Sequence, residues 1–253
     1  KGTSTTGNIK FDAIGAGAWD PAAGRSPVLL RSIAAQDRPT VVAGCVTNIS
    51  EQIVALDAFQ ALRTRLGNAL LVLAPRHTEV AERMRKLREL LQERAIAYVF
   101  KSDLGDAQLP RDIDCLVLDT MGELKDFYAA GDVAYVGLNH NVLEPLCFGK
   151  PVIVTPGWNP VYPSYPVYTR LLAQGVITQV AHDALADAWF DVLRDASGRA
   201  ARADSILAAL ESLKGAAERD LDLLAGFGLL QEAERRRQPH SSSPSALEKT
   251  LRA

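Results

Sequence analysis

The stretch from residue 133 to residue 154 limits the fold more than any other part of this chain. Apolar residues 133–136 lead into Gly137 and a short polar segment, and a second apolar run begins at Lys150-Pro151. Short apolar runs bounded by Gly and Pro are typical of buried strands, and the residues between them suffice for a short helix that begins near Val142. The stretch therefore predicts a strand, a polar loop, a helix and a second strand.

The same alternation extends along most of the chain. Further strands are predicted at 40–46, 69–74, 97–100, 114–118 and 176–180, and helices at 50–66, 78–94, 123–130, 165–174 and 182–196. Strands that alternate with helices are typical of a parallel sheet covered on both faces. We expect an α/β protein with a Rossmann-like, doubly wound parallel sheet and a helical C-terminal tail.

The order of the strands also predicts where a ligand binds. Right-handed crossovers place the carboxyl ends of all parallel strands at one edge of the sheet. The segments after Gly44, Ala74, Asp119 and Gly137 follow the ends of predicted strands. We expect these segments to line a single crevice.

Several residues in these segments are suited to an anionic ligand. Arg76 can hold a phosphate or a carboxylate with two parallel hydrogen bonds. Gly44 allows a phosphate or a partner domain to approach the backbone closely. Glu144, in the first helical turn, complements the helix dipole or accepts hydrogen bonds from two ribose hydroxyls, and Asn141 either caps that helix or contacts the ligand.

Two more segments leave alternatives open. Gly122 would expose backbone amides to a base or to phosphates at the point where Glu123 opens a helix. Met121 packs under a base or in the core. His77 caps the next helix, lies on its surface or contacts the ligand, and Asp119 stabilises a turn.

Four ordered motifs resemble those of a known family. Residues 7–12 read GNIKFD, residues 74–77 read APRH, residues 119–124 read DTMGEL, and HN-x-LEP begins at His140 and is followed by GKPVI. In order and spacing they resemble the donor-binding half of the Kdo (3-deoxy-D-manno-octulosonic acid) transferases, which are GT-B glycosyltransferases of lipopolysaccharide synthesis. Beyond residue 180 the resemblance extends only to the general layout.

The resemblance implies two Rossmann-like domains with different roles. The second domain binds the nucleotide sugar, and the first supplies the acceptor site and the general base, so the catalytic residues of this chain are unknown and the fragment is expected to be inactive alone. In this interpretation His140 and Asn141 lie over the phosphate and the donor sugar. The candidate donor-binding residues are Gly44, Arg76, His77, Met121, Gly122, Glu123, Gly137, His140, Asn141 and Glu144.

The resemblance also implies partners and a location. CMP-Kdo is the favoured nucleotide sugar, and a lipid A or other surface-glycan acceptor would bind through the missing domain. The sugar would move by displacement without a metal. We expect the full-length protein at the cytoplasmic face of a bacterial inner membrane, with membrane contact only through the missing domain.

Two segments depart from the family pattern. Kdo transferases usually carry a Ser-x-His-Glu-Gly-Glu type sequence where residues 46–51 of this chain read VTNISE, with Asn48 or Ser50 as the expected helix cap and Glu51 in the first turn. They also carry a longer Gly-Gly-Ser loop where only Leu138-Asn139 precedes His140. A transferase with a different nucleotide sugar, a non-hydrolysing sugar-nucleotide epimerase and a non-catalytic scaffold therefore remain alternatives.

One loop has no clear counterpart in the family. Residues 157–166 are aromatic and proline-rich. Such a loop suits a ligand lid, a partner contact or a rigid structural element.

Composition narrows the possible partners. The formal net charge is −2 and no basic stripe is evident, so nucleic acid is not expected. The sequence contains no run of about 18 apolar residues, so no membrane-spanning helix is predicted. Cys45, Cys115 and Cys147 lack metal-ligand spacing, so we expect buried free thiols, a reducing compartment, and neither a metal nor a cofactor.

The expected domain limits follow from these patterns. Residues 1–36 form a linker and entry segment, 37–200 the nucleotide-sugar-binding domain, 201–237 C-terminal helices and 238–253 a flexible tail. A helical pattern from 199 to 237 has a break near Gly226-Phe227-Gly228. The glycines at 15 and 17 do not form a dinucleotide fingerprint, because the third glycine and a preceding strand are missing.

Overall fold

A computed structural model describes residues 3–13, 19–227 and 229 of the chain. It divides into two compact units, one made of residues 14–212 and the other of residues 1–13 with 213–253. This division differs from the expected limits at 36 and 200. The expected tail after 238 and the glycines at 15 and 17 lie outside the described residues.

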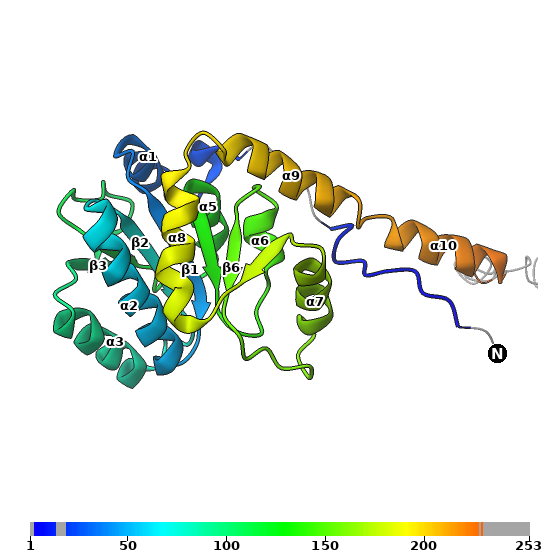
Figure 1. Ribbon diagram of the computed structural model, residues 1–253, viewed down its shortest axis with the longest axis horizontal. Coiled ribbons are helices and arrows are strands. Elements are labelled where there is room, and N and C mark those ends of the chain that lie inside the picture. The colour runs from blue at the N-terminus through cyan, green and yellow to red at the C-terminus, as the bar shows by residue number, and fades with distance from the viewer. Residues whose placement is uncertain (1–2, 14–18, 228, 230–253) are drawn as a thin grey trace, which may run out of the picture. The chain divides into compact units, whose positions relative to one another are not determined.

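The larger unit is built on a seven-stranded sheet in the order β3-β4-β2-β1-β5-β6-β7 (Figure 1). All neighbouring strands pair in parallel. The order reverses direction between β1 and β5, as in a doubly wound fold, which confirms the predicted fold class. The strands are β1 (Thr40–Val46), β2 (Leu70–Pro75), β3 (Tyr98–Phe100), β4 (Cys115–Val117), β5 (Val133–Val136), β6 (Val152–Val154) and β7 (Ile177–Gln179).

Helices cover both faces of this sheet. On one face α2 packs against both α3 and α8, and on the other α5 packs against both α1 and α6 (Figure 1). The helices of this unit are α1 (Pro27–Ala35), α2 (Ile49–Leu66), α3 (Ala81–Glu93), α4 (Lys101–Leu104), α5 (Leu124–Ala130), α6 (Leu143–Leu146), α7 (Tyr165–Ala173), α8 (Leu185–Arg194) and α9 (Arg199–Glu211), with short 3-10 turns η1 (Pro21–Ala23) and η2 (His182–Ala184).

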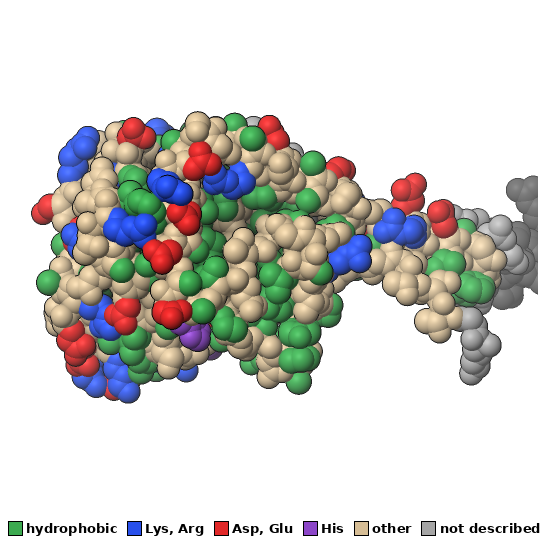
Figure 2. Space-filling model, in the orientation of Figure 1, with side chains coloured by type: hydrophobic (Ala, Val, Ile, Leu, Met, Phe, Trp, Pro, Cys, Tyr) green, Lys and Arg blue, Asp and Glu red, His purple; other side chains and the backbone are tan. Residues whose placement is uncertain are grey.

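The strands are apolar in sequence because their side chains are buried, as the core on the α2 side of the sheet shows. Val41 and Ala43 alternate with residues that face the other layer, and they join Phe59 of α2 and Trp189 of α8 in one buried cluster. Burial of each large side chain contributes about 1.5–3 kcal/mol. On the face shown in Figure 2, acidic and basic side chains are interspersed over the outer helices.

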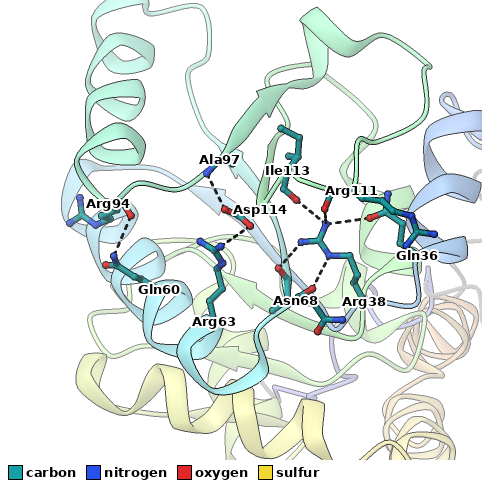
Figure 3. Close-up of polar contacts among 11 residues, drawn as sticks. Gln36, Arg38, Gln60, Arg63, Asn68, Arg94, Ala97, Arg111, Ile113 and Asp114 are labelled. Atoms are coloured by element: carbon teal, nitrogen blue, oxygen red, sulfur yellow. Dashed lines mark hydrogen bonds and ion pairs between the residues drawn. The ribbon is translucent and has the colours of Figure 1, made fainter.

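Arginine side chains fasten the amino ends of the strands (Figure 3). Arg38 donates to the carbonyl oxygens of Asn68 at 2.7 Å, Ala69 at 3.0 Å and Ile113 at 2.8 Å, which precede β2 and β4. Arg63 of α2 forms an ion pair with Asp114 at 2.9 Å. Arginine side chains therefore hold the loops at the amino ends of the strands. The polar loops predicted to bind a ligand lie at the carboxyl ends.

Three local features differ from expectation. The helix expected from 78 begins at Ala81, after His77, which adopts a positive φ of 61°. The helical pattern expected from 199 to 237 has an additional interruption at residues 212–215, where Gly215 has φ 89°, and the next helix, Ala216–Gly226, ends at the expected break near Gly226. The expected linker and entry segment contains α1, whose Leu29, Leu30 and Ile33 are buried.

The smaller unit pairs the N-terminal segment with α10 (Ala216–Gly226). The carboxylate of Asp12 accepts hydrogen bonds from the backbone N–H groups of Gly215 and Ala217, which lie at the start of this helix. Arg219 donates to the carbonyl oxygen of Thr6 at 2.7 Å. Among the described residues, no helix is both long and apolar enough to span a membrane.

Candidate functional site

The carboxyl end of β1 is distorted at Cys45. The register between β1 and β2 shifts between Gly44 and Val46, and Cys45 has a positive φ of 58°. Such a conformation is unfavourable for a residue with a side chain and is enriched at functional sites. The strand therefore ends in a bulge that faces the predicted crevice.

The glycines at this edge permit close contacts within the protein. A Cβ on Gly44 would lie 1.8 Å from the hydroxyl oxygen of Tyr128, and one on Gly137 would lie 2.2 Å from the carbonyl oxygen of Cys45. The N–H of Gly137 donates to the carbonyl oxygen of Gly44 at 2.9 Å. A contact between either glycine and a ligand stays a prediction.

A buried carboxylate joins the loops after β1 and β5. Glu51 accepts hydrogen bonds from the backbone N–H groups of Thr47 at 2.8 Å, Asn48 at 3.1 Å and Leu138 at 2.7 Å. The side chain of Asn48 accepts from the N–H of Glu51 at 2.9 Å, which completes a capping box. Of the two expected caps, Asn48 is confirmed and Ser50 is not used.

His140 lies at the same junction. Its Nε2 is 2.8 Å from the hydroxyl oxygen of Thr47, which is also 3.2 Å from the carbonyl oxygen of Cys45. Because the hydroxyl has one proton, it donates either to that carbonyl or to the imidazole. Burial, followed by the nearby charge of Arg76, lowers the pKa of His140.

Arg76 brings a positive charge to this group. Its backbone N–H donates to the carbonyl oxygen of Val46 at 2.9 Å, while the residue itself is exposed. Burial and the charge of Glu144 raise the pKa of Cys45 to about 11, although a hydrogen bond and the charge of Arg76 oppose the shift. Cys45 is therefore a neutral thiol at pH 7, partly buried beside Arg76 and Glu144. Its place in this crevice was not predicted.

The helix that carries Glu144 begins one residue later than expected. Val142 is its N-cap residue, and the side chain of Asn141 accepts a hydrogen bond from the N–H of Leu143 at 3.1 Å. Glu144 is half-buried, and its charge contributes to raising the pKa of both Cys45 and Tyr128. Asn141 therefore stabilises the helix entry, and Glu144, like Arg76, acts electrostatically on Cys45.

The loop after β4 makes different contacts. Met121 is 79% exposed, so the prediction that it packs in the core is wrong. Gly122 has φ 82°, and a Cβ there would lie 2.8 Å from the guanidinium of Arg25, which donates to the carbonyl oxygen of Met121 at 3.1 Å. Arg25 was not among the predicted residues.

Two acidic residues of this loop have structural partners. Glu123 is buried, accepts a hydrogen bond from Ser26 at 2.7 Å and pairs with Lys101 at 3.5 Å. Asp119 accepts from the N–H of Ser102 at 2.9 Å and from its hydroxyl, as expected of a residue that stabilises a turn. The carboxylate of Glu123 is thus already paired within the protein.

His77 lies on the surface. It is exposed, and its Nδ1 lies 3.3 Å from a carboxylate oxygen of Glu79. The following helix begins four residues later, so the expectation that His77 caps it is wrong.

The aromatic loop after β6 contacts the loop after β5. Asn139, with φ 66°, accepts hydrogen bonds from the N–H of Asn159 and from the hydroxyl of Ser164, both at 2.7 Å. Trp158 is buried and stacks on Tyr168 with ring centroids 4.3 Å apart. The base of the loop is therefore anchored within the protein, while Val161 at its tip is 86% exposed.

Six of the ten predicted residues therefore fall into two groups. Arg76, His140 and Glu144 act electrostatically on Cys45 or on one another at the edge of β1, β2 and β5. The segment 121–123 instead contacts residues 25, 26 and 101. Within the part of the chain that the structure describes, no three His, Cys, Asp or Glu residues form a group that could hold a metal ion.

Sequence comparison finds curated relatives of this chain. A 3-deoxy-D-manno-octulosonic acid transferase of Haemophilus influenzae is 33% identical over 232 residues, which is 88% of this chain and 51% of that relative. Over most of its length this chain is therefore similar to the Kdo transferases. It spans about half the length of the Haemophilus relative.

Two further comparisons give a similar result, one in sequence and one in fold. The Kdo transferase of Bordetella pertussis is 32% identical over 167 residues, which is 60% of this chain and 35% of that relative. The C-terminal CMP-Kdo binding domain of WaaA from Acinetobacter baumannii superposes with a TM-score of 0.57 at 21% identity, over 70% of this chain and 98% of that domain. No protein-family model matches the chain.

Proposed function

We propose that residues 14–212 bind the nucleotide-sugar donor of a GT-B glycosyltransferase, with CMP-Kdo as the favoured donor. The observation that carries the proposal is that Arg76 and Glu144 both act electrostatically on Cys45, and Arg76 also on His140, at the carboxyl ends of β1 and β5. Ligands of open α/β sheets bind where the strand order reverses. The 33% identity to a Kdo transferase over 88% of this chain supports this assignment.

Each side chain has a role that its chemistry suits. Arg76 is exposed, and its guanidinium would hold the phosphate or the sugar carboxylate with two parallel hydrogen bonds. Glu144 would accept hydrogen bonds from the two ribose hydroxyls. A neutral His140, whose pKa is lowered by burial, would contact the phosphate without repelling Arg76.

The reaction of the whole protein follows from this arrangement. An acceptor hydroxyl would attack the anomeric carbon while the nucleotide phosphate leaves, and Arg76 would stabilise the negative charge that develops on that phosphate. The general base and the acceptor site would come from the other half of the protein. A lipid A acceptor would place the reaction at the inner membrane surface.

A second candidate is a transferase with a different nucleotide sugar. The bond from Leu138 to Glu51 closes the short loop before His140, and this is where the chain departs from the family pattern. A short loop held in this way would leave less space beside a donor sugar. Such an arrangement would favour a different donor without changing the class of reaction.

Calorimetric titration of the chain with CMP, UDP and GDP tests both candidates. We expect CMP to bind most tightly, and Arg76→Met and Glu144→Gln each to weaken it about tenfold, equivalent to about 1.4 kcal/mol. Arg85→Met, which removes the same charge from an exposed ion pair on α3, is the matched control. Selective binding of UDP or GDP would support the second candidate, whereas no binding at millimolar nucleotide would overturn both.

A further inference from the structure

A recess lies at the opposite edge of the sheet from the candidate donor site. Asp132 directly precedes β5 and Lys150-Pro151 directly precede β6, so the recess is at the amino ends of the strands. Its volume is about 230 Å³, smaller than the roughly 300–1,000 Å³ of drug-sized sites. It is lined by Asp132, Phe148, Gly149, Lys150, Pro151, Arg199, Ala200 and Ala203.

The negative charge in this recess is already compensated. One oxygen of Asp132 accepts a hydrogen bond from the N–H of Thr40 at 2.9 Å, and the other pairs with the guanidinium of Arg199. The N–H of Asp132 in turn donates to the carbonyl oxygen of Thr40 at 2.9 Å. Asp132 and Arg199 therefore form a fixed pair with no net charge.

Lys150 adds a positive charge without a matching anion. Among the hydrogen bonds and ion pairs of the described residues, none involves its ammonium group, although its backbone N–H donates to the carbonyl oxygen of Pro145. Burial lowers the pKa of this ammonium, and the charge of Asp132 opposes that shift. A partly buried cation without a paired anion is unfavourable, so an anion in the recess would relieve it.

The remaining walls select the kind of anion. Phe148, Pro151, Ala200 and Ala203 present carbon surface, and Gly149 closes one wall, because a Cβ there would lie 2.7 Å from the Cβ of Ala203. The single uncompensated positive charge of Lys150 matches a ligand with a single negative charge. A phosphate dianion would bring a second charge with no partner, whereas a carboxylate on a small apolar body satisfies both features.

We propose that this recess binds a small organic carboxylate, whose anionic end pairs with Lys150 and whose apolar body rests on Phe148 and Pro151. The site is separate from the candidate donor crevice, since the two lie at opposite ends of β5 and β6.

Titration of ¹⁵N-labelled chain with benzoate, followed by amide chemical shifts, tests the proposal. We expect shifts at Gly149, Lys150 and Ala200 that saturate at millimolar benzoate, and weaker binding of inorganic phosphate. Lys150→Met should weaken benzoate binding about tenfold, the loss expected when one close ion pair is removed. Because burial disfavours the ammonium, this variant should fold normally.

Lys125→Met is the matched control. Its ammonium lies 5.8 Å from the Phe148 ring but outside the recess, so benzoate binding should change less than about twofold. The proposal is overturned if benzoate at about 50 mM, well above a millimolar dissociation constant, causes no shifts around the recess. Unchanged affinity in Lys150→Met, tighter binding of phosphate, or shifts confined to the loop at His140 would also overturn it.

Discussion

The carboxylate of Glu51 accepts a hydrogen bond from the backbone N–H of Leu138 at 2.7 Å, and this bond fastens the loop after β1 to the loop after β5. The first loop follows Cys45 at the end of β1, and the second carries His140. Besides the pairing of β1 with β5 and the contact between Thr47 and His140, one buried carboxylate therefore holds the two loops together.

Glu51→Ala should lower the free energy of unfolding by about 3 kcal/mol, because it leaves three backbone donors without their acceptor. Urea denaturation measures the loss. Glu89→Ala, at an exposed position on α3, should change stability by less than about 0.5 kcal/mol. Equal stability of the two variants would contradict the role given to Glu51.

His140 should titrate below its ordinary value of 6.5, since burial and Arg76 both disfavour the imidazolium. The unfolded chain takes up this proton near pH 6.5, and the folded chain takes it up only at lower pH. The contribution of His140 to stability is therefore complete above pH 6.5 and is lost as the pH falls through the pKa of the folded state. Titration of the imidazole carbon shifts by NMR measures the pKa.

Arg76→Met should raise the pKa of His140, because it removes the second largest cause of the shift. Arg85→Met serves again as the control and should leave the imidazole titration unchanged. A pKa that is the same in wild type and Arg76→Met would show that the guanidinium does not act on His140.

Gly44→Ala should destabilise the chain by about 3 kcal/mol, since the added methyl would lie 1.8 Å from the hydroxyl oxygen of Tyr128. Combining it with Tyr128→Phe should recover part of the loss. Gly226→Ala is the control, because no atom lies within 4 Å of a Cβ at that helical position. Thermal unfolding compares the variants, and a stable Gly44→Ala chain would disprove the close packing.

Arg38→Met should reduce stability by about 2 kcal/mol, because the carbonyl oxygens before β2 and β4 lose their donor. Since Arg38 is at the amino edge, nucleotide affinity at the opposite edge should stay within about twofold of wild type. Guanidinium denaturation and CMP titration on the same preparations separate the two effects, and a parallel loss of affinity would contradict this separation.

Hydrophobic pattern predicted the sheet because most of its strands are short, largely apolar runs between turn residues. The strand predicted at 40–46 has those limits in the structure, and the helix predicted from 50 begins at Ile49. Local pattern also identified Asn48 and Glu51 as residues of the helix entry, because a capping box depends only on neighbours in the sequence.

Contacts between distant residues could not be predicted in this way. Nothing in the sequence shows that Glu51 reaches Leu138, 87 positions away, or that Arg25 covers Gly122. The positive φ of Cys45 is equally hidden, because the apolar run around it suggests a regular strand. The donor-binding roles of Arg76, His140 and Glu144 stay predictions.

The stacked pair of Trp158 and Tyr168 gives the crevice an optical reporter. The indole is shielded from water, while the loop that carries it is tied to Asn139 next to His140. Any rearrangement of that loop would alter the polarity around the indole and shift its fluorescence emission. Occupancy of the crevice would then be readable in solution from a chromophore that the chain already contains.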